Sequence, residues 1–149
     1  TRATTLHFAE ATADGVRALY DNGLRALLGD FVLDEKGNPS ISYHLDIDAW
    51  RRVRRECFYR DPETNMIFCA CDIVLNMFTV EEIPHELDRI ASFYPGRGFI
   101  DILIHEQYFH EDYVLYLPDY RDRVEAGVRW CVAHDYKPAH ISDMLDLKE

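Results

Sequence analysis

The chain has 149 residues, of which 27 are acidic and 16 basic, and its formal net charge at pH 7 is −11. This length suits a single domain with its own core, and a hydrophobic content of 48% excludes a disordered chain. The negative charge would repel phosphate backbones and anionic lipid surfaces, so we expect no nucleic-acid partner and no membrane partner.

The first third of the chain predicts a strand, a helix and a second strand. Residues 4–9 have the pattern of a short strand that starts almost at the first residue. Thr12 is expected to cap a helix that Gly23 ends. Residues 24–28 predict the second strand, and the turn-forming segment 34–39 predicts an exposed loop.

Predicted strands and helices continue to alternate through the middle of the chain. Residues 41–46 predict a third strand, which leads into a helix capped by Asp48 and broken after residue 60. The apolar run 66–75 predicts a strand that ends near Asp72. The segment from Thr79 to Glu82 matches a capping box at the start of the next helix.

A basic run lies within the helix expected after Asp48. It consists of Arg51, Arg52, Arg54 and Arg55, and it falls opposite an apolar stripe at helical spacing. Such charge runs are typical of a solvated helix face, so we assign this run no function.

The last third opens on the apolar run 99–104, which ends abruptly in His105 and Glu106. A run rich in β-branched residues predicts a buried strand that delivers titratable groups to one end of a sheet. Pro118 is expected to start a helix, and residues 139–141 predict a short last strand. The charged tail 143–149 is expected to form a helical turn or to fray.

Strands that alternate with helices imply parallel pairing through right-handed crossovers. The expected fold class is therefore α/β, with mainly parallel strands in an open sheet or a partial or distorted (β/α) barrel. A complete eightfold barrel typically needs about 250 residues, so residues 1–149 form a single α/β domain that could supply only part of one.

Titratable side chains follow four of the expected strands, at the edge where ligand sites of parallel sheets lie. Two histidines and a carboxylate are the usual minimum for a catalytic metal with an open position. These groups are His7 with Glu10, His44 with Asp46, Asp72, and His105 with Glu106. No H-x-x-x-H, H-E-x-x-H or C-x-x-C motif accompanies them, so structural roles remain the alternative.

His105 is a candidate general acid or base near neutral pH, and a buried histidine bonded to neighbouring backbone is the alternative. The loop that follows is rich in aromatic residues, including Tyr108, over residues 108–116. Aromatic side chains of this kind could stack on sugar faces or could simply anchor the loop.

Cysteine occurs at positions 57, 69, 71 and 131. Cys69 and Cys71 lie in a predicted strand, so their thiols point to opposite faces and do not readily share a metal. Buried free thiols are the better interpretation, and they favour a reducing, cytoplasmic compartment.

The segment from Ile102 to His105 resembles the late Leu-x-His strand motif of the polysaccharide deacetylase family, and residues 135–141 are similar to its Gly-Tyr-x-Phe-like ending. This family is a distorted (β/α) barrel of metal-dependent carbohydrate esterases. The resemblance implies that Leu103 lines the acetyl pocket and that His105 is the catalytic acid. It also implies an acetylated sugar as substrate and a divalent metal, zinc by expectation, as cofactor.

Further candidates come from the strand ends and from the aromatic loop. Those expected to contact substrate are Glu106, Tyr108, His7 and Asp72, and His44 is the candidate metal ligand.

Three elements of the family pattern are missing from the chain. These are the Thr-Phe-Asp-Asp run, the His-x-x-x-His pair and an Arg-x-Pro-Tyr stretch after Leu24. We therefore expect residues 1–149 to be the C-terminal part of a larger barrel, completed by an N-terminal segment or by a second copy in a homo-oligomer. The alternative is a non-catalytic carbohydrate-binding or assembly domain of the same fold.

Overall fold

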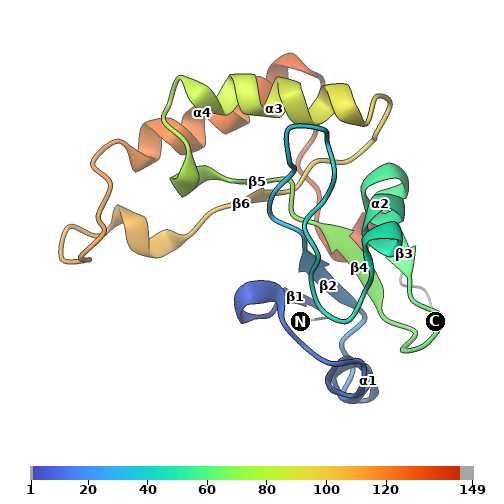
Figure 1. Cartoon of the computed structure of the whole chain (residues 1–149). Coiled ribbons are helices and arrows are strands. Elements are labelled where there is room, and N and C mark those ends of the chain that lie inside the picture. Colours follow the sequence, from blue (N-terminus) through green and yellow to red (C-terminus); the bar gives the residue numbers. More distant parts are fainter. Residues whose placement is uncertain (1, 145–149) are drawn as a thin grey trace.

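A computed structural model describes residues 2–144, and the part of the charged tail beyond residue 144 lies outside the described residues. The fold is mixed α/β, with a mainly parallel four-stranded sheet and a separate parallel pair (Figure 1). The described residues form no closed barrel. None of their helices is long and apolar enough to cross a membrane.

The strands come in the order expected of an α/β chain, with one antiparallel addition. They are β1 (Ala3–Thr5), β2 (Ala26–Gly29), β3 (Phe58–Arg60), β4 (Ile67–Ala70), β5 (Ile73–Val74) and β6 (Ile102–Leu103). The longer helices that pack on these strands are α1 (Ala13–Asp21), α2 (Ile47–Glu56), α3 (Glu82–Phe93) and α4 (Tyr120–Ala133). Short helical turns complete the fold: η1 (His7–Ala9), η2 (Leu75–Met77), η3 (Glu106–Phe109) and α5 (Ile141–Met144).

The four-stranded sheet has the order β1-β2-β4-β3, in which β1, β2 and β4 are parallel and β3 is antiparallel to β4. Only two residues separate β4 from β5, where the chain passes into the second sheet. The Cys71 N–H still donates to the Gly29 carbonyl beside β2, whereas the Asp72 N–H donates to the Asp101 carbonyl beside β6. Cys71 and Asp72 therefore join the two sheets.

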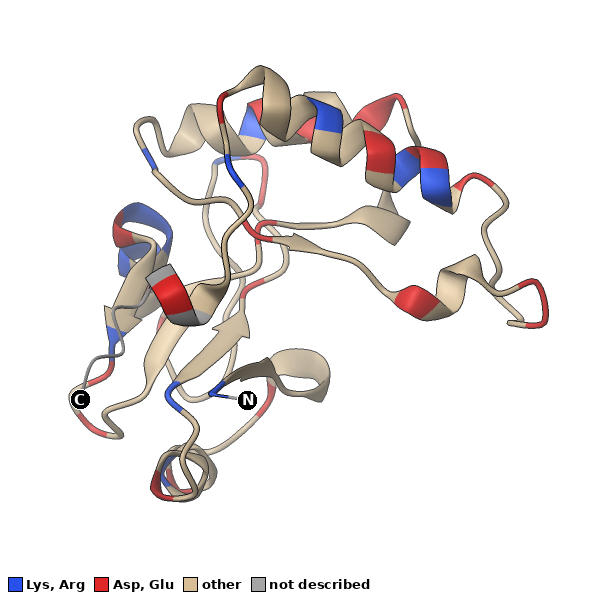
Figure 2. Cartoon of the chain, turned by 180° about the vertical axis from the view of Figure 1, so that it is seen from behind, with Lys and Arg blue, Asp and Glu red and all other residues tan. Residues whose placement is uncertain are grey.

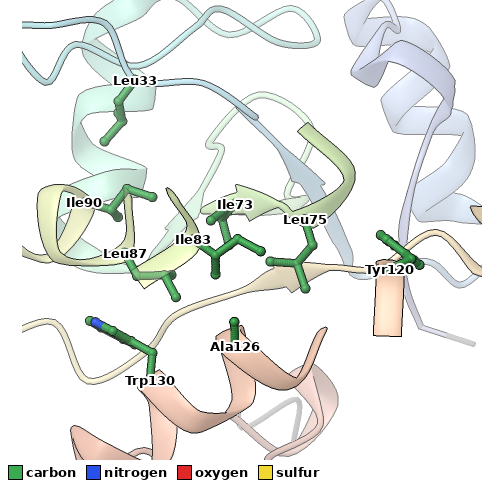
Figure 3. Close-up of a cluster of buried hydrophobic side chains, with 9 residues drawn as sticks. All are labelled: Leu33, Ile73, Leu75, Ile83, Leu87, Ile90, Tyr120, Ala126 and Trp130. Atoms are coloured by element: carbon green, nitrogen blue, oxygen red, sulfur yellow. The ribbon is translucent and has the colours of Figure 1, made fainter. Parts of the chain in front are cut away.

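The apolar residues divide into groups that follow these two sheets. One cluster lies between β5, α3 and α4, and Figure 3 shows Ile83, Leu87 and Trp130 converging there with Ile73 and Leu75. A second cluster packs α1 and α2 against one face of the four-stranded sheet around Trp50 and Phe68, and a small third one includes Cys69. Cys69 and Cys71 are both buried free thiols, as predicted.

Helices with strong local signals match the sequence predictions. Thr12 caps α1 by accepting from the Gly15 N–H at 3.2 Å. The capping box forms before α3, because the Thr79 N–H donates to Glu82 Oε2 at 2.8 Å and the Glu82 N–H donates to Thr79 Oγ1 at 3.3 Å. These bonds satisfy backbone donors that a helix start leaves open.

Two predicted strands are absent, and the first strand of the chain, predicted over 4–9, ends at Thr5 because residues 7–9 form η1. Residues 41–46 form a loop in which Tyr43 has a left-handed φ of 55°, and Asp46, not Asp48, caps α2 through the Ala49 N–H. Residues 139 and 140 are in no strand, and Ile141 begins α5. In both places the alternating pattern was too short to be decisive, and turn conformations satisfied the backbone instead.

The predicted buried strand at 99–104 is shorter and more open than expected. Only Ile102 and Leu103 pair with β5, and both side chains are half-buried. Ile104 is 42% exposed. The helix after Asp46 also ends earlier than predicted, at Glu56, because Cys57 takes a left-handed φ of 67° and turns the chain into β3.

Candidate functional site

Parallel pairing of β5 with β6 places His105 beside Asn76. Val74, the last residue of β5, is paired with Leu103, the last residue of β6, and the residues two positions further on, Asn76 in η2 and His105 before η3, lie side by side. The His105 Nδ1 atom lies 2.8 Å from Asn76 Oδ1. Because an amide oxygen only accepts, this bond places a proton on Nδ1 and leaves Nε2 as the nitrogen that can exchange a proton with a ligand.

The backbone at this site is held by α4. The buried Tyr120 hydroxyl accepts the His105 N–H at 2.9 Å. Arg123, one turn along the same helix, donates from Nη1 to the Asn76 carbonyl at 3.3 Å and from Nε to Asp119 at 3.0 Å. Both partners of the His105–Asn76 pair are therefore positioned by a single helix.

Aromatic rings surround this pair, as the sequence of the following loop suggested. The Tyr108 ring lies edge-on to His105 with ring centres 6.0 Å apart, and it also contacts Tyr113 and Tyr120. Phe109 packs on Tyr120 and leaves 43% of its surface exposed. Burial raises the pKa of Tyr120, so its hydroxyl stays neutral while it holds His105. Tyr108 is thus both an anchor and the nearest aromatic wall to His105.

A second polar cluster lies where the two sheets meet, with Asp30, Arg54 and Asp72 buried and Arg97 and Asp101 partly buried. It consists of Asp30 after β2, Arg54 on α2, Asp72 between β4 and β5, Arg97 after α3, and Asp101 before β6. Arg54 forms ion pairs with both Asp30 and Asp72, and all three side chains are 0% exposed. Arg97 donates to both oxygens of Asp72, from Nη1 to Oδ1 at 2.6 Å and from Nη2 to Oδ2 at 3.1 Å, so that Oδ1 is shared with Arg54. We call this group the junction cluster.

The junction cluster accounts for the carboxylate predicted at residue 72. The two carboxylate oxygens of Asp72 accept hydrogen bonds from Arg54, from Arg97 and, at 2.8 Å, from the Asp101 N–H. Burial raises the pKa of Asp30 against the lowering effect of Arg54. A carboxylate so enclosed serves to hold the two sheets together, and its oxygens are already engaged by protein groups.

Asp101 makes this cluster sensitive to pH. Burial, and after it the adjacent Asp72 carboxylate, raise the pKa of its carboxyl to about 7 against the lowering effects of Cys71, Arg97 and Arg54. The folded state therefore favours the neutral acid. The resulting stabilisation is complete below the ordinary aspartate pKa of 3.8 and is lost as the pH rises through 7.

We expect Asp101→Asn to flatten the pH dependence of folding. Between pH 5 and pH 8 the free energy of unfolding should fall by about 2–3 kcal/mol less in this variant than in the wild type. Urea unfolding at a series of pH values measures this difference. The exposed Asp112→Asn serves as the matched control and should follow the wild-type curve, and coincident curves for Asp101→Asn and wild type would contradict the assignment.

The structure does not bring the remaining predicted site residues to His105. His7 is exposed in η1 and stacks on Phe8, Glu106 is exposed in η3, and Leu103 is half-buried in β6. His44 Nε2 lies 3.1 Å from Asp61 Oδ2. Among the described residues, no hydrogen bond or ion pair links His7, His44 or Asp72 with His105.

The fit of a metal can be judged from the donors that the structure brings together. Within residues 2–144 no group of three or more His, Cys, Asp or Glu side chains could hold a metal ion. His44 has one carboxylate neighbour, and its Nδ1 is buried without a hydrogen-bond partner. The described residues therefore do not fit a divalent metal.

Several residues of these sites were missed in the sequence, including Asp30, Arg97, Tyr120 and Arg123 as well as Arg54, Asp101 and Asn76. Arg54 lies at the apolar spacing of Trp50 and Val53, which was a readable sign that it points inward. Asp101 interrupts an apolar run, which is a similar sign. Asn76 had no local sign, because only the register of β5 with β6 places it beside His105.

Comparison of the chain with protein-family models, with curated proteins and with solved structures found no match.

Proposed function

We propose that this chain carries the acid-bearing edge of a polysaccharide deacetylase-like carbohydrate hydrolase, built as part of a (β/α) barrel. The observation that carries the proposal is the His105–Asn76 pair, 2.8 Å apart at the C-terminal ends of two parallel strands. Ligand sites of parallel α/β proteins lie at this edge of the sheet. The motif around Leu103 and His105 supports the same interpretation.

In this function His105 transfers a proton to the leaving nitrogen of an acetylated amino sugar. For this step His105 carries a proton on each ring nitrogen. Nδ1–H donates to Asn76 Oδ1, the proton on Nε2 is the one transferred, and the Tyr120 hydroxyl accepts the His105 backbone N–H. Tyr108 and Phe109 offer ring faces against which a pyranose could stack. Leu103 would contact the acetyl methyl group.

The attacking half of such a reaction would have to come from outside residues 1–149 or from a second copy of them. The described residues do not fit the divalent metal that a deacetylase of this family uses, so no step is assigned to a metal here. An N-terminal segment or a second copy of the chain could add strands beside β1 and β6, which lie at the edges of their sheets. Either partner would complete the barrel.

Two observations favour a second function. The described side chains do not fit a divalent metal, and the loop at 108–116 is rich in aromatic residues. A carbohydrate-binding domain needs the rings at 108–116 but no attacking group. Phe109 at 43%, Val114 at 88% and Leu115 at 56% exposure leave apolar surface on this loop. Such surface is typical of a binding site that remains open.

Acetate release from N-acetylated chitin oligosaccharides, measured together with their binding by calorimetry, tests the two functions. In the assembly that completes the barrel, acetate release that is abolished by a chelator supports the hydrolase, whereas binding without acetate release supports the binding domain. Fully deacetylated oligosaccharides are the matched ligand control. If the chain neither binds nor hydrolyses the acetylated series, both functions are rejected.

A further inference from the structure

A cavity of about 430 Å³ lies between α2 and the end of α3, apart from the residues of the His105 site. Its volume falls in the range that small-molecule sites occupy. Cationic side chains from α2 face aromatic side chains that follow one another at the end of α3. The lining includes Arg51, Arg55, Arg97, Phe93, Tyr94 and Asn38.

The cationic wall is unusual in a chain with a net charge of −11. Figure 2 shows basic positions gathered on α2, while acidic positions are spread over the other elements. Arg54 points inward to the junction cluster, but Arg51 and Arg55 lie one helical turn apart on the cavity side. Two like charges at this spacing repel each other, and an anion between them would relieve that repulsion.

The present partners of these two arginines can be exchanged at low cost. Arg51 lies 2.9 Å from Asp48, with side chains 49% and 81% exposed, and 3.0 Å from Asn38 Oδ1. Arg55 lies 3.4 Å from Glu56 and is 66% exposed. Exposed ion pairs of this kind contribute only about 0–1 kcal/mol. Both guanidinium groups can therefore turn toward a ligand.

The opposite wall is fixed before any ligand arrives. Tyr94 donates from its hydroxyl to the Gly37 carbonyl at 2.8 Å. Gly37 has a φ of +78°, and a Cβ atom at this position would lie 2.5 Å from the Phe93 ring. This loop and the end of α3 therefore fit closely together, which gives the cavity a rigid aromatic side.

Arg97 closes the base of the cavity without adding free charge. Its Nη1 and Nη2 groups are bound to Asp72, and its side chain is only 7% exposed. Its buried Nε has no hydrogen-bond partner of good geometry, although the Cys57 thiol lies near the guanidinium. The positive charge that a ligand in the cavity can reach therefore comes from Arg51 and Arg55, whose present ion pairs are exposed.

We propose that this cavity binds a small organic phosphate, with the phosphoryl group between Arg51 and Arg55 and its organic ring against Phe93 and Tyr94. Two guanidinium groups complement the charge of a phosphate monoester dianion, and their planar donors suit its oxygens. A neutral sugar lacks the charge, and a carboxylate provides only one unit of it. The proposal does not depend on the function of His105.

Isothermal titration calorimetry with glucose 6-phosphate, inorganic phosphate, glucuronate and glucose tests this site. We expect glucose 6-phosphate to bind at least about tenfold more tightly than glucuronate or glucose, since a hydrogen bond to a charged group is worth about 1.5–3 kcal/mol. Inorganic phosphate should bind more weakly than glucose 6-phosphate, because it leaves the aromatic wall unused.

Arg51→Gln and Arg55→Gln should each weaken binding of glucose 6-phosphate by about tenfold or more. Arg52→Gln is the matched control, because Arg52 has the same charge, lies on the same helix and is 51% exposed, yet it stacks on Tyr59 away from the cavity. It should change the affinity less than about twofold, as a surface charge does at a distance. Circular dichroism checks that each variant is folded.

Several results would overturn the proposal. Absence of glucose 6-phosphate binding rejects the site. Equal affinity for glucuronate shows that the site does not select phosphate, and equal loss in all three arginine variants shows diffuse attraction to α2. Equal affinity for inorganic phosphate shows that the aromatic wall takes no part.

Discussion

Arg54→Met is expected to lower the free energy of unfolding by about 3–5 kcal/mol, because it leaves two buried carboxylates without their shared cation. Arg54 is fully buried and pairs with both Asp30 and Asp72. It also donates to the backbone carbonyls of Asp30 and Cys71 at 3.0 and 3.2 Å. Urea unfolding at pH 7.5 measures the loss. Methionine fills a similar space, so the effect reports the missing charge and hydrogen bonds.

Two further variants make this prediction specific. Arg55→Met, at the next position on α2, has a side chain that is 66% exposed, and it should alter stability by less than about 0.5 kcal/mol. Adding Asp30→Asn and Asp72→Asn to Arg54→Met should recover part of the loss, because uncharged amides cost less to bury than unpaired carboxylates. Equal stability of the Arg54→Met and Arg55→Met variants would reject a structural role for the junction cluster.

His105→Ala is expected to reduce kcat/KM for acetate release from chitin oligosaccharides by about 10²–10⁴-fold, the usual contribution of a positioned general acid. The loss should fall mainly on kcat, since the proton is needed in the transition state and not for binding. Steady-state acetate release in the preparation that hydrolyses the substrate gives both constants. The melting temperature of each variant verifies that it is folded.

Variants of Asn76 and His110 distinguish the loss of His105 positioning from a general disruption of the site. Asn76→Ala should give a smaller fall in kcat than His105→Ala, since Asn76 acts only through its bond to Nδ1, and Asn76→Asp should retain more activity because a carboxylate also accepts that bond. His110→Ala changes an exposed histidine of the same loop and should match the wild type. Undiminished acetate release by His105→Ala would remove His105 from the reaction.

Local signals in the sequence were enough to predict the main helices. Thr12 before α1 and the Thr79–Glu82 pair before α3 act over three residues, so their effect can be read without knowing the fold. The alternating pattern at 41–46 is equally local, yet the chain there satisfies its groups by turning, with the Tyr43 N–H donating to the Ala9 carbonyl. Such contacts between distant residues override a short pattern.

The candidate site was predictable only in part, because contacts between residues that are distant in the sequence also determine it. His105 at a strand end was readable, since an apolar run stopped at it. Its partner Asn76 depends on the pairing of two strands 28 residues apart along the chain, from Val74 to Ile102, and that register is a property of the folded molecule. The antiparallel β3 was missed because it follows an unusual backbone turn at Cys57.

The division of the apolar residues into separate clusters has a consequence for cooperativity. The cluster around β5, α3 and α4 is joined to the four-stranded sheet largely by the charged groups of the junction cluster and by the link at Cys71 and Asp72. We therefore expect the two regions to open as distinct foldons, and amide exchange at Asp72 and Ile73 measures when they separate.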